Sequence, residues 1–291
     1  MATKVLKLFA RCLRMNRGKL TEKEIRTFQK CVYTYYRNNK RELPWRLTTN
    51  PYKILVSEIM LQQTQVPRVI PKYNEFIRQF PNINSLSRAP LRKVLRAWSG
   101  LGYNRRASSL QRAAQQVTRD FNGAIPRSHE ALVTLPGIGN ATAQAILAYV
   151  YNLPVVFIET NIRTVFIHQF FKGRKEINDK DILPLVEQTL DREKPRVWYS
   201  ALMDYGTMLK EQYGNASKQS AHYTRQSRFE GSHRQLRGFI LKELLKRKGV
   251  RFQELEKTVK YLPQAISLRG ALKELEQERF ITKTRTLFRI A

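Results

Sequence analysis

The sequence predicts an all-α protein with a small α+β module at its C-terminal end, and three observations support this prediction. Apolar residues recur at intervals of three and four along most of the chain, as in amphipathic helices, without a succession of alternating strands. With 42% hydrophobic residues among 291, the chain has enough length and apolar surface for two or three compact units. The β-branched and aromatic residues that favour strands gather near the end, at 280–282 and 286–290.

Helices are expected at intervals through the first 210 residues. Pro44 in Leu43-Pro44-Trp45-Arg46 is expected to break helical structure and to leave this segment extended. Thr49-Asn50-Pro51 supplies an N-cap and a first-turn proline for the next helix. The polar segment 214–231 has no apolar period and is expected to be a linker or a surface loop. In chain order the predicted helices cover 22–37, 51–63, 66–78, 91–97, 104–121, 128–134 and 140–151, a segment directly after Glu159, then 183–190 and 197–209.

The composition shifts divide the chain into a basic arm at 1–22, a helical domain at 23–231 and a winged-helix-like domain at 232–291. The last domain combines predicted helices at 234–248, 252–260 and 263–278 with a strand hairpin. The third helix of such a domain would enter a DNA groove, but Glu274, Glu276 and Glu278 would repel phosphates. Both a DNA-contacting role and a protein-contacting or structural role therefore remain open for this domain.

The charge of the chain indicates a polyanionic partner. Lys and Arg number 53 against 23 Asp and Glu, which gives a formal charge of +30. No apolar run approaches the roughly 18 residues that span a bilayer, so nucleic acid is favoured over a membrane. The first twenty residues contain no acid, which fits a DNA-contacting arm, a solvated end or an organelle transit peptide. We expect a monomer in the cytoplasm or nucleoid of a bacterium, or in the nucleus or mitochondrion of a eukaryote.

Two cysteines, Cys12 and Cys31, limit the possible cofactors. They exclude a disulfide framework and any four-cysteine metal or iron–sulfur site built by one chain. The sequence therefore predicts no metal site of the cysteine type.

Two glycines in Leu135-Pro136-Gly137-Ile138-Gly139-Asn140-Ala141-Thr142 precede an apolar helix. Glycines at such a position leave backbone N–H groups accessible to a phosphate, and Gly137, Ile138, Gly139, Asn140 and Thr142 are the candidate contacts. A hydrated monovalent cation bridging this hairpin to phosphate is a further expectation. An ordinary turn between two helices is the alternative.

Two glutamates are candidates for acid–base chemistry. Glu58 shares a helical face with Ile54, Leu55 and Leu61, where burial would raise its pKa as a general acid requires. Glu159 precedes a helix whose N-terminal N–H groups would keep it ionised. Carboxylates with pKa values separated in this way suit cleavage of a glycosidic bond. A core glutamate paired with an arginine is the alternative for Glu58.

The motifs of this chain resemble those of the MutY-type adenine DNA glycosylases, members of the endonuclease III superfamily of helix-hairpin-helix glycosylases. The resemblance covers roughly residues 25 to 210 and implies a two-lobed domain that flips an adenine, mispaired with guanine or 8-oxoguanine, out of double-stranded DNA. The matching runs are Leu43-Pro44-Trp45-Arg46, Pro51-Tyr52-Lys53, Ser57-Glu58-Ile59-Met60-Leu61-Gln62-Gln63-Thr64-Gln65-Val66, Trp98-Ser99-Gly100-Leu101-Gly102-Tyr103 and Leu135-Pro136-Gly137-Ile138-Gly139.

The resemblance also implies roles for single residues. Glu58 matches the acid that protonates adenine N7, and Asn161 matches an asparagine that orients the catalytic carboxylates. Gln63 matches a wedge that enters the base stack, and Tyr103 an aromatic that intercalates beside the opposing guanine. The residues that match positions near the extruded base are Trp45, Arg46 and Ala141.

This chain departs from the family pattern at four places. Glu159 stands where the family carries an aspartate, so its carboxylate extends about 1.5 Å further. Ala141 stands where bifunctional relatives place a Schiff-base lysine, which predicts a monofunctional glycosylase. Residues 208–229, where most relatives bind an iron–sulfur cluster, contain no cysteine, so we expect no cluster. The remaining chain is too short for a hydrolase-like domain that recognises 8-oxoguanine, and a winged helix is expected instead.

Three functions therefore remain open: a monofunctional adenine glycosylase, a mismatch glycosylase for uracil, thymine or another damaged base, and a catalytically silent DNA-binding protein. An acid on an apolar helical face at Glu58 favours the enzymes over the silent protein.

Overall fold

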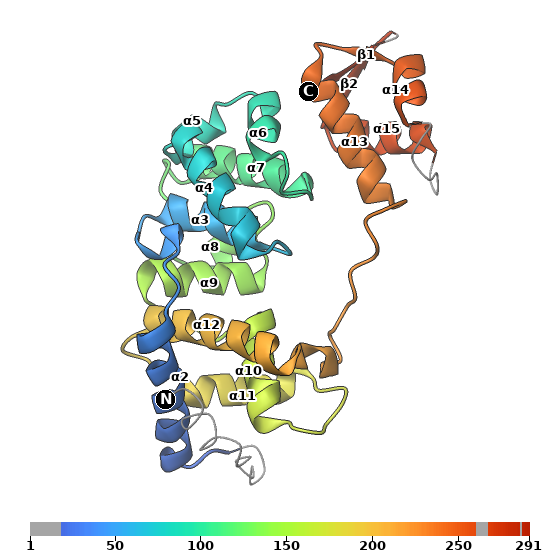
Figure 1. Ribbon diagram of the computed structural model, residues 1–291. Helices are drawn as coiled ribbons and strands as arrows, with labels where there is room; N and C mark the ends of the chain where they lie inside the picture. Colours follow the sequence, from blue (N-terminus) through green and yellow to red (C-terminus); the bar gives the residue numbers. More distant parts are fainter. Residues whose placement is uncertain (1–18, 260–266, 286) are drawn as a thin grey trace. The chain divides into compact units, whose positions relative to one another are not determined.

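The computed structural model describes residues 19–259, 267–285 and 287–291 (Figure 1). Most of the expected N-terminal arm and the first residues of the expected helix 263–278 lie outside the described residues. The chain divides into two compact units. One contains residues 1–50, 127–129 and 139–224, and the other contains 51–126, 130–138 and 225–291.

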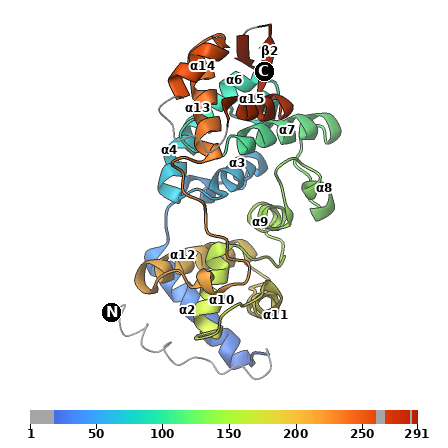
Figure 2. The same cartoon turned by 90° about the vertical axis from the view of Figure 1, so that its right-hand side faces the viewer.

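The first unit is a helical bundle with an aromatic core. Its helices are α2 (Glu22–Asn39), η1 (Pro44–Arg46), α9 (Asn140–Tyr151), α10 (Thr160–Phe170), α11 (Asp179–Thr189), α12 (Pro195–Tyr213) and η2 (Ala216–Gln219). Helices α10 and α12 pack side by side, and α2 crosses α12 (Figures 1 and 2). Phe28, Phe166 and Trp198 are fully buried. The ring centre of Phe28 lies 5.5 Å from that of Phe166 and 5.8 Å from that of Trp198, in edge-to-face contacts. This core fixes the start of α10, where Glu159 lies.

The second unit joins a helical subdomain to the C-terminal module. The subdomain contains α3 (Pro51–Leu61), α4 (Val66–Gln79), α5 (Ile83–Ser87), α6 (Leu91–Trp98), α7 (Arg105–Asp120) and most of α8 (His129–Val133). Its core includes Trp98, Phe76 and Phe80. Helix α5 was not predicted from the sequence. It is only five residues long, and Asn82 caps it by accepting a hydrogen bond from the Ser85 N–H.

The C-terminal module has the element order of a winged helix. It comprises α13 (His233–Lys246), β1 (Val250–Arg251), α14 (Phe252–Val259), α15 (Leu268–Gln277), β2 (Ile281–Thr284) and β3 (Leu287–Ile290). The three strands are antiparallel in the order β1-β3-β2, with Val250 opposite Phe288 and Ile281 opposite Ile290. The prediction of three helices and a hairpin is confirmed for the described residues. The sequence did not indicate β1, because two residues are too few for a visible alternation.

An arginine attaches this module to the helical subdomain. Arg92 of α6 donates to the carbonyl oxygens of Leu244, Leu245 and Arg247 at 2.9, 2.9 and 2.7 Å. These carbonyls end α13 and have no partner within their own helix, so a guanidinium there satisfies them and complements the negative end of the helix dipole.

Two helix boundaries were predicted wrongly, and one of them is the end of α12, which lies at Tyr213 instead of 209. Helix α11 begins at Asp179, four residues before the expected start at 183. The Asp181 carboxylate accepts a hydrogen bond from the Asn178 N–H and stabilises this earlier first turn. Pro184 is the sixth residue of the helix, so the N–H that would bond the Lys180 carbonyl oxygen is missing there. Within the described ranges, no helix is both long and apolar enough to cross a bilayer.

Candidate active site

Glu159 is the N-cap of α10. Its backbone is extended (φ −125°, ψ 178°), and its Oε1 accepts hydrogen bonds from the N–H groups of Asn161 at 2.6 Å and Ile162 at 3.1 Å. A capping carboxylate satisfies two N–H groups that the first helical turn leaves unpaired. The helix-entry position predicted from the sequence is therefore confirmed.

Asn161 connects Glu159 to helix α12. Its side-chain Oδ1 accepts a 2.7 Å hydrogen bond from the Lys210 ammonium, and its Nδ2 lies 3.7 Å from the Met203 sulfur. Gly206, one turn before Lys210, permits this approach, because a Cβ there would lie 2.5 Å from the Asn161 carbonyl oxygen. The structure thus brings together a carboxylate, an amide and an ammonium from two helices.

The electrostatics of Glu159 combine two opposing effects. Burial raises the pKa of the Glu159 carboxyl, while the Lys210 charge and the backbone N–H groups of Asn161 and Ile162 act in the other direction. Burial also lowers the pKa of Lys210, and the Glu159 charge opposes that shift. The sequence argument included the N–H groups but not the burial, so it missed the net upward direction of the Glu159 shift.

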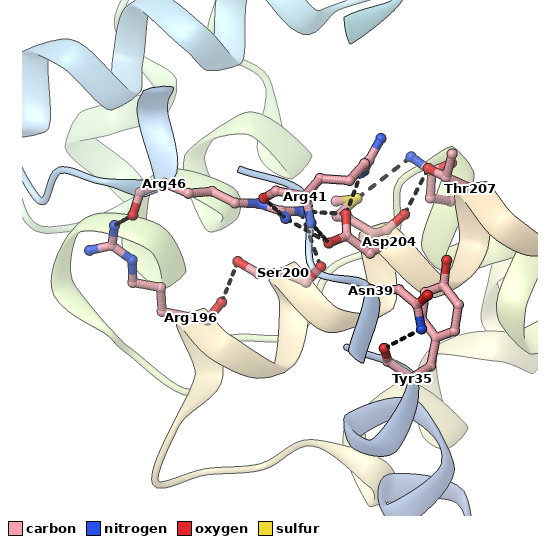
Figure 3. A network of polar contacts seen from close by, with 10 residues as sticks. Tyr35, Asn39, Arg41, Arg46, Arg196, Ser200, Asp204 and Thr207 are labelled. Carbon is pink, nitrogen blue, oxygen red and sulfur yellow. Dashed lines mark hydrogen bonds and ion pairs between the residues drawn. The ribbon is translucent and has the colours of Figure 1, made fainter. Parts of the chain in front are cut away.

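Arg46 and Trp45, expected near an extruded base, lie in η1 of the same unit. The Arg46 guanidinium donates two hydrogen bonds to the Asp204 carboxylate, at 2.8 and 2.9 Å, and the Arg41 guanidinium donates a third at 2.5 Å (Figure 3). Asp204 is 2% exposed. Burial raises its pKa, but the bonds and charges of Arg46 and Arg41 outweigh this and hold the pKa below the usual range. In this structure Arg46 anchors η1 to α12, and Trp45 is buried beside it.

Glu58 lies in the second unit, on α3. Ile54 and Leu55, one turn earlier, are buried, and Glu58 itself is half-buried. The apolar setting predicted from helical spacing is therefore confirmed for these two neighbours. Leu61, one turn later, is only half-buried.

Gln63 and Tyr103, the residues expected to enter the base stack, share an unusual backbone conformation. Their φ angles are +53° and +50°, in the left-handed region that non-glycine residues seldom adopt. Gln63 is exposed and Tyr103 half-buried. Such strain, of order 1–3 kcal/mol per residue, persists only where surrounding contacts enforce it, and it is frequent at functional sites.

Arg106 supplies those contacts. Its guanidinium donates to the carbonyls of Ile59, Met60 and Gln62 at 3.0, 2.8 and 2.5 Å, and to Leu101 and Gly102 at 3.3 Å each. Burial lowers its pKa to about 10. One arginine therefore joins the end of α3, before Gln63, to the loop that carries Tyr103.

The C-terminal part of the second unit contacts Tyr103 directly. The Tyr103 hydroxyl accepts hydrogen bonds from Gln226 and from Arg234, and the Arg234 guanidinium carbon lies 4.9 Å from the ring centre. Arg106 lies at 5.5 Å from the same ring. Two arginines thus contact the Tyr103 ring.

The Gly137–Gly139 hairpin follows α8 and begins α9. Gly137 has φ +84°, and a Cβ there would lie 2.8 Å from the Ser109 Cβ, so glycine is required. Gly139 has an ordinary φ and is the N-cap of α9, with open space where its Cβ would be. Ile138 is buried, whereas Asn140 and Ala141 are exposed at the first turn, with Thr142 beside them. The hairpin geometry fits the predicted phosphate contact.

Comparison with known proteins identifies this arrangement. Residues 56–195 match the model of the HhH-GPD superfamily of base excision DNA repair proteins. This segment is an HhH-GPD domain. It includes Glu58, the hairpin and Glu159, so the prediction of a helix-hairpin-helix glycosylase family is confirmed.

Curated relatives that this chain resembles are adenine DNA glycosylases. The protein of Buchnera aphidicola (strain Bp) is 40% identical over 186 residues, covering 62% of this chain and 52% of the relative. That of Mycobacterium tuberculosis is 37% identical, covering 60% and 59%, and that of Homo sapiens 32%, covering 63% and 36%. The chain therefore spans about half the length of the first two relatives or slightly more, and less of the human one.

Solved structures confirm the fold of the HhH-GPD segment and its surroundings. A thermostable thymine-DNA glycosylase aligns with TM-score 0.60 and 25% identity, covering 70% of this chain and 99% of that chain. Endonuclease III in a covalent complex with DNA aligns with TM-score 0.51 and 19% identity, covering 66% and 86%.

The residues of this chain do not fit a four-thiolate iron–sulfur cluster, because the sequence has two cysteines. The segment after α12 offers the hydroxyls of Ser217 and Ser220, both of which are buried, and the imidazole of His222. Asn215 Oδ1 accepts hydrogen bonds from the Ser217 N–H and hydroxyl at 3.1 and 2.6 Å and stabilises the turn. Across residues 19–259, 267–285 and 287–291, no three His, Cys, Asp or Glu side chains are grouped as metal ligands.

Sequence reasoning missed Lys210, Gly206, Arg106 and Arg234 as parts of the site. Each acts through a partner far away in sequence, for example 49 residues for Lys210 and Asn161 and 131 residues for Arg234 and Tyr103. Lys210 is one of several charged residues of α12, together with Arg196, Asp204 and Glu211, and nothing in one sequence connects it to Asn161.

Proposed function

We propose that this protein is a monofunctional DNA glycosylase of base excision repair that removes a flipped-out adenine mispaired with guanine or 8-oxoguanine. The observation that carries the proposal is the half-buried Glu159 carboxylate at the start of α10, beside Asn161 and Lys210, in a chain that is similar to adenine DNA glycosylases and has an HhH-GPD segment. Its partner is double-stranded DNA containing the mispair, bound by a monomer.

In the proposed reaction Glu58 protonates the adenine at N7, and the bond between the sugar carbon C1′ and the base nitrogen breaks with its electron pair going to the base. Glu159 stabilises the positive charge that develops on the sugar. Water adds to C1′ and releases a proton, which leaves an abasic site and free adenine. With Ala141 beside the hairpin, we expect no lysine attack on the sugar and no strand cleavage by the protein itself.

Gln63 and Tyr103 are proposed to occupy the space in the base stack that the flipped nucleotide vacates. Their strained backbones hold them on exposed or half-exposed loop tips without reorganisation on binding. The first turn of α9 at the hairpin, Asn140 and Thr142 included, is proposed to bind the DNA backbone, with a hydrated monovalent cation between hairpin and phosphate.

A panel of duplexes tests this proposal. Protein in excess is incubated with short duplexes that contain A:G, A:8-oxoguanine, U:G or T:G, or only paired bases, and abasic sites are then cleaved with alkali. Breaks at adenine only after alkali are the expected result. Breaks without alkali, or trapping of the protein on DNA by borohydride, would overturn the monofunctional mechanism.

A mismatch glycosylase acting on thymine or uracil is the second candidate. The observation that favours it is the structural match to a thymine-DNA glycosylase along 99% of that protein. Breaks at T or U and none at adenine would select this function. Tight binding without any break would instead indicate a catalytically silent protein.

A further inference from the structure

Arginines of other helices bind two of the three acids at the end of α15. Glu274 and Glu278, one helical turn apart, bind Arg237 of α13 at 3.0 and 2.6 Å. Glu278 also accepts two hydrogen bonds from Arg105 of α7, at 2.8 and 2.6 Å. Burial raises the Glu278 pKa, but these arginines outweigh it and hold the pKa below its usual range. The repulsion expected from the sequence is therefore neutralised for two of three acids.

A second face of the same helix is basic. Arg269 and Lys273, one turn apart, are exposed and line a groove between α15, the start of α14 and the strand hairpin. Lys283 of β2 and Arg285 after it lie on the hairpin side of the groove, and Arg251 of β1 also lines it. Glu276 is the acid of this lining.

Aromatic side chains beneath the groove support two of these cations. The Arg269 guanidinium lies 5.3 Å from the ring centre of Phe252, and the Lys283 ammonium 5.8 Å from that of Phe288. Such contacts restrict long basic side chains without neutralising them, since an aromatic ring carries no net charge. The cations thus remain available to an external anion.

We propose that this groove, which we call the α15 face and define by Arg251, Arg269, Lys273, Lys283 and Arg285, binds the sugar-phosphate backbone of duplex DNA. A helix beside a hairpin, both basic, matches the two neighbouring phosphate rows of a DNA groove, and five cations against Glu276 give the charge complementarity. The α15 face binds DNA without reading bases, and it adds contacts outside the HhH-GPD segment. This inference deepens the proposed function, because it adds a second DNA contact.

Salt dependence of binding tests the α15 face in the full-length protein. Affinity for an undamaged, fluorescently labelled 30-base-pair duplex is measured by anisotropy at several KCl concentrations. The triple variant Arg269→Ala, Lys273→Ala, Lys283→Ala should lower the log–log slope by about 2 to 3, since each lost phosphate contact removes about 0.9. At low salt its affinity should fall by at least tenfold.

A triple variant of the same module is the matched control. Lys242, Lys248 and Lys257 are exposed and lie outside the groove lining, and their replacement by alanine removes the same net charge. This control should change the slope by less than 1. If it lowers slope and affinity as much as the groove variant, binding follows total charge and the α15 face is not a site.

A gain of affinity gives a second test that a folding defect cannot imitate. Glu276→Lys should strengthen duplex binding and steepen the slope, whereas Glu256→Lys, the same charge change on α14 outside the groove, should do so less. Equal effects would overturn the proposal. The affinity for the duplex is also compared with the affinity for a single strand and for an acidic peptide. If the groove variant prefers the duplex as strongly as the wild type does, the proposal is likewise overturned.

Binding to undamaged DNA requires no catalysis, so the two proposals fail separately. If the wild-type protein excises no base but the groove variant binds duplex DNA more weakly, the proposal for the α15 face stands and the proposed glycosylase function is wrong. If the wild-type protein excises adenine but the groove variant has the wild-type salt slope, the glycosylase function stands and the proposal for the α15 face is wrong.

Discussion

The Lys210 ammonium donates a 2.7 Å hydrogen bond to Asn161 Oδ1, while the N–H of the same asparagine donates to Glu159 at 2.6 Å. Asn161 therefore connects a cation to a half-buried carboxylate. Because the charge of Lys210 favours the ionised form of Glu159 against burial, this lysine is a positioning residue for the proposed reaction.

Replacement of Lys210 should change the pH dependence of base excision. In Lys210→Gln, Glu159 loses a nearby positive charge, so its pKa rises further and the acid limb of the single-turnover rate moves to higher pH. We expect about a tenfold lower rate at neutral pH, the effect of about 1.4 kcal/mol of lost transition-state stabilisation. Lys210→Arg should restore the limb. Lys218→Gln, an exposed lysine of η2, is the control and should leave the profile unchanged.

Substitutions of Glu159 should separate its charge from its length. Glu159→Gln should lose about a hundredfold or more in single-turnover rate, because the developing charge on the sugar loses its counter-ion. Glu159→Asp should retain or improve turnover. If both variants excise adenine at the wild-type rate, Glu159 has no catalytic role.

Glu159 also predicts a pH-dependent stability difference. Its folded pKa is raised, so its contribution to stability is present below the unfolded pKa and is lost as pH rises through the folded pKa. Glu159→Gln should therefore gain stability relative to wild type as pH increases from 4 to 8 in urea unfolding. A constant difference across this range would contradict the upward shift.

Glu58→Gln should abolish base release while duplex affinity is retained. A glutamine of the same shape keeps the packing against Ile54 and Leu55 but cannot donate the proton that the departing base requires. Single-turnover excision and anisotropy, measured on the same duplex, test the two halves of this prediction. An active Glu58→Gln protein would exclude Glu58 as the acid.

The contact between Arg234 and Tyr103 should act as a unit in mismatch recognition. Arg234→Ala and Tyr103→Ala should each reduce the preference for mispaired over paired duplex about three- to tenfold, and the double variant should lose little more than either one. Arg228→Ala, an exposed arginine of the same segment, is the control. Additive losses would show that Arg234 contributes independently of Tyr103.

Sequence patterns determined the elements of this protein and much of its chemistry. Apolar periods located most helices, and the spacing of glycines and proline located the hairpin. The motif around Glu58 indicated the family that the HhH-GPD match later confirmed. These features are local, because helix period, capping and turn formation depend on residues within a few positions of each other.

Tertiary structure decided how those elements modify each other. The sequence suggested that Glu276 and its two acidic neighbours on α15 would repel DNA, but Arg237 and Arg105 neutralise Glu274 and Glu278 across the fold. Burial similarly raises the Glu159 pKa, and the charge of Lys210 on another helix opposes this upward shift. Ionisation depends on dielectric environment and on charges within a few ångströms, and only packing brings distant residues into that range.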